Sequence, residues 1–205
     1  LHALCRVEGE YRYHPGDAGR RALANLCLRY LCAAGTNTGR QLAQQQFDAA
    51  NDMTVCLGAL SAQVHSPAPE REDSLAAFHA RYAEDTLVLD KWFALQAGAW
   101  RWAADAAPTL VRVRELLAHP ALLGTFFRGN PGEFHTPEGH AFWAEQIIAL
   151  NGINPQVAAR MARTLERWKG FAPRYQVSMR AALEEVAGTE GLSPDVAEII
   201  GKALG

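Results

Sequence analysis

Apolar residues recur at helical spacing along this chain, and residues that start or end helices bound each run. Asn154-Pro155 and Ser193-Pro194 each place a capping side chain before a proline, which favours the first turn of a helix. No stretch of useful length alternates apolar and polar residues as a strand does. Short turns between helices force neighbours to pair as antiparallel hairpins. The pattern predicts an all-α chain, with stacked helix pairs forming a right-angled bundle or, as we expect, an α-α superhelix.

Capping residues, glycines and prolines set the expected boundaries of each helix. The predicted helices cover about 17–34, 40–50, 53–64, 75–82, 86–102, 108–119, 140–150, 154–168, 172–187 and 194–204. Six glycines and prolines interrupt 121–139, so that segment is predicted to be mostly loop with one short helix. We interpret 1–205 as a single helical domain and 1–16 as a leader or linker from an upstream domain. No strict repeat period supports a tetratricopeptide array.

Composition and charge exclude several classes of protein. Hydrophobic residues make up 49% of the 205 residues and charged residues 20%, which is typical of a globular chain. Lys and Arg total 20 against 22 Asp and Glu, so we expect neither a nucleic-acid partner nor a polybasic membrane surface. No apolar run approaches the length of a transmembrane helix, and Leu1 does not open a secretory leader. We therefore expect a cytoplasmic protein whose four cysteines are buried apolar fillers without a disulfide.

No motif of a common catalytic centre is present. The chain lacks H-E-x-x-H, G-x-S-x-G, the P-loop and G-x-G-x-x-G, so we expect no catalytic residue and no bound metal or other cofactor. His135 and His140, with Glu133 and Glu138 nearby, could ligate zinc, but their spacing matches no standard site. Polar loop histidines are the expected outcome. An enzyme built on this loop remains the least favoured hypothesis.

A polar stripe follows the helix predicted after Asn154-Pro155. It consists of Gln156, Arg160, Arg163 and Arg167, at offsets of 0, 4, 7 and 11 along a helix. An apolar stripe faces elsewhere and consists of Val157, Met161, Leu165 and Trp168. The polar stripe is interpreted as a solvated cationic face. It could also bind a carboxylate, because guanidinium groups offer paired donors.

Several stretches in a fixed order resemble the C-terminal domain of bacterial aminopeptidase N, in the zinc-dependent alanyl aminopeptidase family. They include Arg20–Leu23 with Asn25, Gln46-Phe47, Ala49–Thr54, Leu57–Ala62, Leu89–Phe93 with Leu95–Ala97, Phe134-His135, Asn154–Ala158 with Arg160, Met179–Leu183 and Leu192-Ser193 with Glu198 and Lys202–Leu204. The resemblance covers about residues 8–205. It departs after His119-Pro120, where a longer family segment is missing, and at 137–141.

The resemblance implies a non-catalytic domain of a larger enzyme. In the family, the zinc motif lies in an upstream catalytic domain, and the helical domain closes over it, lines the substrate chamber and restricts the entry of peptides. By the same resemblance, Gln156 and Arg160 lie on the chamber lining, with no role in proton transfer. The expected partners are the upstream catalytic domain and the peptide substrates of the parent enzyme, whose cofactor is zinc. The alternative is a free-standing helical-repeat module for protein–protein interaction.

Overall fold

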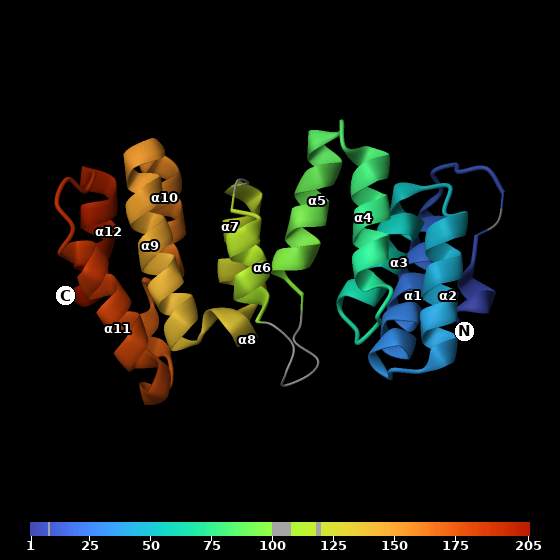
Figure 1. The fold of residues 1–205 in the computed structure, drawn as a ribbon, viewed down its shortest axis with the longest axis horizontal. Helices are drawn as coiled ribbons and strands as arrows, with labels where there is room; N and C mark the ends of the chain where they lie inside the picture. Colours follow the sequence, from blue (N-terminus) through green and yellow to red (C-terminus); the bar gives the residue numbers. More distant parts are fainter. Residues whose placement is uncertain (8, 100–107, 118–119) are drawn as a thin grey trace. The chain divides into compact units, whose positions relative to one another are not determined.

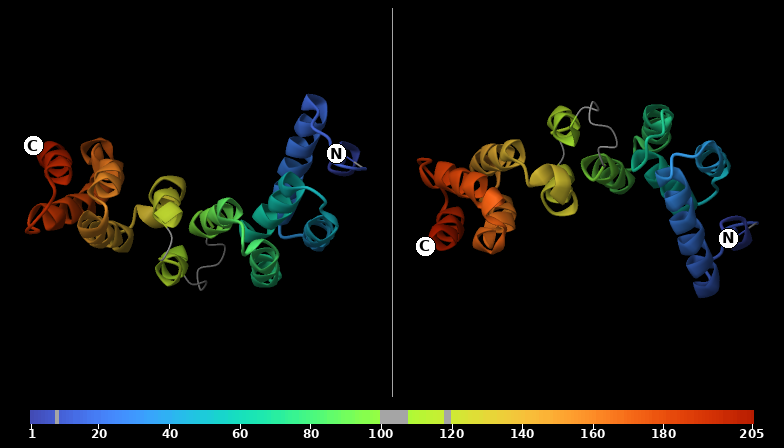
Figure 2. Two further views of the ribbon diagram at one scale, coloured as in Figure 1. Left: turned by 90° about the horizontal axis from the view of Figure 1, so that it is seen from above. Right: turned by 90° about the horizontal axis from the view of Figure 1, so that it is seen from below.

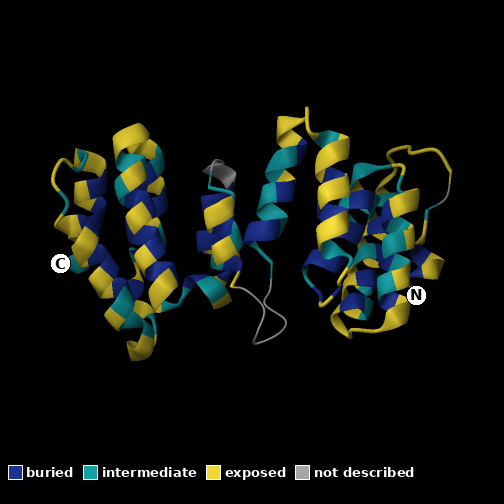
Figure 3. Ribbon diagram, viewed as in Figure 1, coloured by how far each residue is buried: buried dark blue, intermediate teal, exposed yellow. Residues whose placement is uncertain are grey.

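The computed structural model describes residues 1–7, 9–99, 108–117 and 120–205, and within these segments it contains helices and no strand (Figure 1). The prediction of an all-α chain is confirmed. The helices form two compact units, 1–107 and 108–205, each with its own core. In both units the dark-blue buried residues follow one face of most helices and the exposed residues the other (Figure 3).

The N-terminal unit is a series of helices in which each packs on its sequence neighbours. It comprises the 3₁₀ helix η1 (Ala3–Cys5) and the helices α1 (Pro15–Ala33), α2 (Asn37–Ala49), α3 (Met53–Val64), α4 (Arg71–Tyr82) and α5 (Thr86–Ala97). Helices α1, α2 and α3 contact one another, and α3, α4 and α5 continue the stack. Leu28, Leu60 and Phe78 are fully buried between them.

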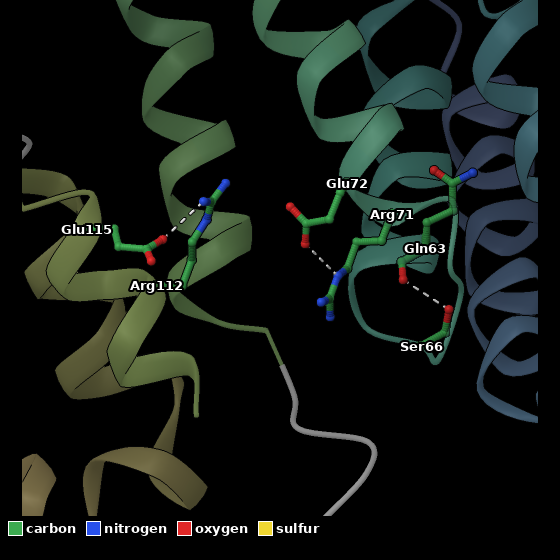
Figure 4. A network of polar contacts seen from close by, with 6 residues as sticks. All are labelled: Gln63, Ser66, Arg71, Glu72, Arg112 and Glu115. Carbon is green, nitrogen blue, oxygen red and sulfur yellow. Dashed lines mark hydrogen bonds and ion pairs between the residues drawn. The ribbon is translucent and has the colours of Figure 1, made fainter. Parts of the chain in front are cut away.

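Polar side chains fix the ends of these helices. The carboxylate of Asp52 accepts a hydrogen bond from the backbone N–H of Val55 at 2.9 Å, which caps the start of α3. The Ser66 hydroxyl donates to the carbonyl of Gln63 at 3.0 Å just after α3 ends (Figure 4). The predicted turn at 36–39 is instead the capped first turn of α2, which therefore begins earlier than expected.

The C-terminal unit repeats this mode of packing. It comprises α6 (Thr109–Glu115), α7 (Pro120–Gly129), α8 (Pro131–Phe134), α9 (Pro137–Ile153), α10 (Pro155–Ala162), the 3₁₀ helices η2 (Arg163–Leu165) and η3 (Trp168–Gly170), α11 (Pro173–Ala187) and α12 (Pro194–Leu204). Helix α9 packs against α10 and α11, and α12 packs against the same two helices (Figure 2). Arg112 Nη1 and Glu115 Oε2 form an ion pair at 3.2 Å in the last turn of α6 (Figure 4). Stacking of helix pairs is thus confirmed within each unit.

The prediction that 121–139 is mostly loop is wrong. The segment contains most of α7, all of α8 and the start of α9, because its prolines and most of its glycines lie at helix ends, while Gly124 is accommodated inside α7. Asn130 caps α8 and Thr136 caps α9, each just before a proline. The phenylalanine side chains of the segment pack against one another and against α9. The buried rings are Phe126, Phe127, Phe134 and Phe142, with centroids 5.2–6.2 Å apart.

Other predicted boundaries are also corrected. The helix predicted over 154–168 leaves α geometry after Ala162 and continues as two 3₁₀ turns. Helix α5 ends at Ala97, and the predicted continuation over 100–102 lies outside the described residues, as does 118–119 at the predicted end of the next helix. No helix in the described part of the chain is both long and apolar enough to cross a membrane.

Candidate functional site

Gln156 and Arg160 lie one turn apart on the exposed side of α10, as the sequence predicts. The helix is held in place by its buried side, where Ala158, Met161 and Ala162 pack inward. The Asn154 side chain accepts a hydrogen bond from the Val157 N–H at 3.2 Å and fixes the first turn. Both polar side chains are therefore directed away from the core by the same geometry that buries the apolar stripe.

The two side chains line a groove of about 410 Å³ between α10 and α12. Arg163 joins them on this wall. The opposite wall is formed by the charged face of α12, with Asp195, Glu198, Ile199 and Lys202, and Glu166 lies beyond Arg163. Arg167 does not line the groove, because α10 ends at Ala162 and the following 3₁₀ turns change the direction of the stripe. Of the four polar residues predicted to share one stripe, three therefore line the groove.

Ion pairs occupy most of the charges in this groove. Arg163 Nη1 lies 3.7 Å from Glu166 Oε2, and Lys202 Nζ pairs with Glu198. The hydrogen bond and the charge of Lys202 hold the pKa of Glu198 below its usual value. Arg160 makes no hydrogen bond or ion pair with any other described residue. Its guanidinium is therefore the cation of the groove available to an incoming carbonyl or carboxylate.

The chemistry that this groove supports is binding. Arginine stays charged at working pH and cannot exchange a proton, and a glutamine amide has no titratable group. The acidic and basic residues on α12 were not identified as site residues from the sequence. The i, i+4 pair Glu198 and Lys202 is a visible signal of an exposed helix face, but nothing in the sequence indicates that this face meets α10.

His135 and His140 do come together, but they bond to each other. His135 Nδ1 lies 3.3 Å from His140 Nε2, and His140 Nδ1 lies 2.9 Å from the hydroxyl of Ser178. The Ser178 hydroxyl donates to the carbonyl of Tyr175, so it accepts from His140 Nδ1–H, and His140 Nε2 accepts from His135. The sequence gives no signal for Ser178, which lies 38 positions from its partner.

Burial sets the protonation state of this histidine pair. His140 is fully buried, and its burial together with the neighbouring His135 lowers its pKa to about 4. Burial also lowers the pKa of His135. Both rings are thus neutral near pH 7, held in a hydrogen-bonded chain. Across the described residues, no group of three or more His, Cys, Asp or Glu side chains lies close enough together to hold a metal ion.

Comparisons with known proteins match the whole chain to part of larger proteins. Aminopeptidase N of Escherichia coli strain K12 is 39% identical over 96% of this chain and 24% of its own length. Aminopeptidase N of Caulobacter vibrioides is 37% identical over 100% of this chain and 25% of its own length. The crystal structure of Legionella pneumophila aminopeptidase A in complex with aspartic acid matches with a TM-score of 0.86 and 25% identity, over 99% of this chain and 26% of that one.

The chain therefore spans about a quarter of the length of the curated relatives that it matches. The resemblance to a region of aminopeptidase N, carried above by short motifs, extends over the full chain in these comparisons. A family model, described as a domain of unknown function (DUF3458_C) with ARM repeats, matches residues 1–205. With that match over its entire length, this chain belongs to the DUF3458_C family of ARM-repeat domains.

Proposed function

We propose that this chain is the non-catalytic C-terminal domain of a zinc-dependent aminopeptidase of the aminopeptidase N type. In the proposal it caps the catalytic domain, lines the substrate chamber and restricts the access of peptides. The match to about a quarter of each aminopeptidase N supports a role as one domain of such an enzyme. The described residues do not fit a zinc site, since no suitable cluster of ligands occurs among them. The zinc would therefore be held by residues of the parent outside this chain.

An apolar surface on α1 supports docking against another domain. Leu23, Leu26 and Tyr30 recur at helical spacing and are 40%, 46% and 72% exposed. The leader adds Leu1 and Leu4, which are 71% and 83% exposed. Large apolar side chains exposed together on one helix face mark a surface that is covered in the working protein. The proposal assigns this surface, which we call the α1 face, to contact with the upstream catalytic domain in the cytoplasmic parent enzyme.

The unpaired guanidinium of Arg160 is the observation that carries the proposed chamber role. The groove on α10 presents this cation beside the amide of Gln156, while Arg163 and Lys202 are engaged by carboxylates. A peptide bound for removal of its N-terminal residue presents carbonyl groups and, at its far end, a carboxylate. Arg160 can donate charge-assisted hydrogen bonds to these groups, and Gln156 can donate or accept one more. Neither side chain takes part in the chemistry of bond cleavage.

The test is the kinetics of Arg160→Ala in the full-length parent enzyme. Losing one charged hydrogen bond costs about 1.5–3 kcal/mol, so kcat/KM on a tripeptide should fall roughly tenfold to a hundredfold. The loss should lie in KM, with kcat nearly unchanged, because the contact is the same in the ground state and the transition state.

The matched control is Arg163→Ala, which removes a cation from the same groove that is already paired with Glu166. Its kcat/KM should stay within about twofold of wild type, because exposed pairs contribute little. Unchanged constants for Arg160→Ala on both a tripeptide and an aminoacyl amide would remove the chamber assignment. A full-length gene product without any peptidase activity would favour the alternative of a free-standing interaction module.

A further inference from the structure

A second pocket lies in the N-terminal unit, between the leader, α1 and the α2–α3 connection. It has a volume of about 270 Å³. Arg21 and Asn25 of α1 line it, together with Gln46 of α2 and Asn51 of the connection. Its volume lies just below the usual range of ligand pockets, which suits a compact molecule rather than a long peptide.

Arg21 is the unusual residue of this pocket. It is only 5% exposed, yet it makes no hydrogen bond or ion pair with another described residue. The ring of Tyr11 lies over its guanidinium at 4.9 Å and covers one face of the group. The N–H donors of a guanidinium lie in its plane, at right angles to that contact, so the stacking leaves them unused. None of the Arg21 nitrogens is among the fully buried side-chain atoms without a partner, so its donors are accessible from the pocket, where an incoming acceptor can reach them.

Three acceptors of the pocket wall are already engaged. The side-chain oxygen of Asn25 accepts from Gln46 Nε2 at 2.9 Å. The side-chain oxygen of Gln46 is bonded to His2 Nε2 at 2.9 Å, and the carbonyl of Gly9 accepts from Asn51 Nδ2 at 2.9 Å. The amides of Asn25 and Asn51 each use one N–H in the wall, which leaves one donor each. The pocket is thus rich in free donors.

We propose that this pocket binds the carboxylate of a small organic acid, with Arg21 as its bidentate donor. A carboxylate matches the planar fork of a guanidinium, and its remaining lone pairs can accept from Asn25 and Asn51. The described residues that line the pocket include no carboxylate that could take this place. The assignment does not depend on the proposed chamber contact, because that contact lies in the C-terminal unit and this pocket lies in the N-terminal one.

The experiment is a titration of the 205-residue chain with sodium succinate at constant ionic strength, followed by the Nε–Hε signals of its arginines in ¹H–¹⁵N spectra. One arginine signal should shift with saturation, and it should be absent in Arg21→Lys. Calorimetry should give a succinate affinity at least tenfold weaker in Arg21→Lys and Arg21→Met than in wild type, since charged hydrogen bonds are lost. Arg20→Met is the matched control, because Arg20 is the adjacent but exposed arginine of α1, and its affinity should stay within twofold.

Further arms define the results that would overturn the assignment. A wild-type chain that shows no saturable shift, or an Arg21→Met variant that binds as wild type does, would refute it. Tighter binding of phosphate, or of the blocked peptide acetyl-Ala-Glu-Ala-amide, would refute the choice of a small organic acid. Glu8 follows Val7 in the sequence and lies outside the described residues, so Glu8→Gln is included. Binding that occurs only in Glu8→Gln would show that Arg21 already has a partner within the chain.

Discussion

Replacing Gly139 by alanine should destabilise the C-terminal unit, because a methyl group has no room there. Gly139 lies in the first turn of α9, where it is buried against the end of α8. A Cβ atom at this position would lie 2.2 Å from the carbonyl oxygen of Phe134 and 2.7 Å from that of Glu133. Both are backbone atoms of the preceding turn, so neither can rotate away as the end of a side chain could.

The change in the free energy of unfolding combines two destabilising contributions and one stabilising contribution. Overpacking a rigid contact costs roughly 1–3 kcal/mol. Moving the turn also disturbs the cap in which the Thr136 hydroxyl accepts from the Gly139 N–H at 3.0 Å, a contact of a kind that contributes about 0.5–2 kcal/mol. Alanine in place of glycine in a helix recovers about 0.5–1 kcal/mol. The net expectation is a loss of about 2–3 kcal/mol.

Gly152→Ala is the matched control, because Gly152 is in the same helix and a Cβ there meets nothing within 4 Å. That variant should be neutral or more stable by up to about 1 kcal/mol. The assay is guanidinium unfolding followed by far-ultraviolet circular dichroism, with both variants compared with wild type. Equal unfolding midpoints for the two variants would refute the argument that the close approach of α9 to α8 requires glycine at 139.

Two further predictions concern the pH dependence of stability and the zinc content of the isolated chain. The pKa of His140 is about 4 in the fold against 6.5 ordinarily, so the unfolded chain takes up the proton first as pH falls. The free energy of unfolding should therefore decrease between pH 6.5 and 4, by about 3 kcal/mol from this group. Denaturant curves of His140→Gln should show a smaller decrease over the same range. The same pH dependence in the variant and in wild type would contradict the assignment. The isolated chain should hold no stoichiometric zinc by elemental analysis and should not hydrolyse alanyl anilide, and turnover that copurifies with it would contradict this prediction.

Much of the fold was accessible from the sequence because its helix caps are local. Asn154 and Ser193, each before a proline, do cap α10 and α12, where their side chains accept backbone hydrogen bonds at 3.2 and 3.4 Å. Such a cap involves only the next three residues, so it can be predicted from a short stretch of sequence. The same holds for the face on which Gln156 and Arg160 lie, since a helix of known start places residues four apart together.

The misreading of 121–139 has the opposite cause. By local pattern its glycines and prolines indicate a loop, whereas in the structure Pro131 and Pro137 occupy first turns and Gly139 allows close packing. What stabilises the segment is the burial of phenylalanine rings against α9, a tertiary contact that no local pattern reports. Likewise, the pairing of α10 with α12 and the contact between His140 and Ser178 depend on how distant helices meet. Those parts of the candidate site required the structure.

The packing of each helix on its close sequence neighbours has a consequence for how the chain folds. In the N-terminal unit, α1 contacts α2 and α3, and α3 contacts α4 and α5. Each described helix of this unit can therefore be buried against helices that are close to it in the sequence. Closing short loops costs little entropy, and chains dominated by such local contacts cross their folding barrier quickly. A nascent chain could therefore bury its apolar surface helix by helix as it leaves the ribosome. Once residues 1–107 have emerged, the N-terminal core can form before the second unit has been made.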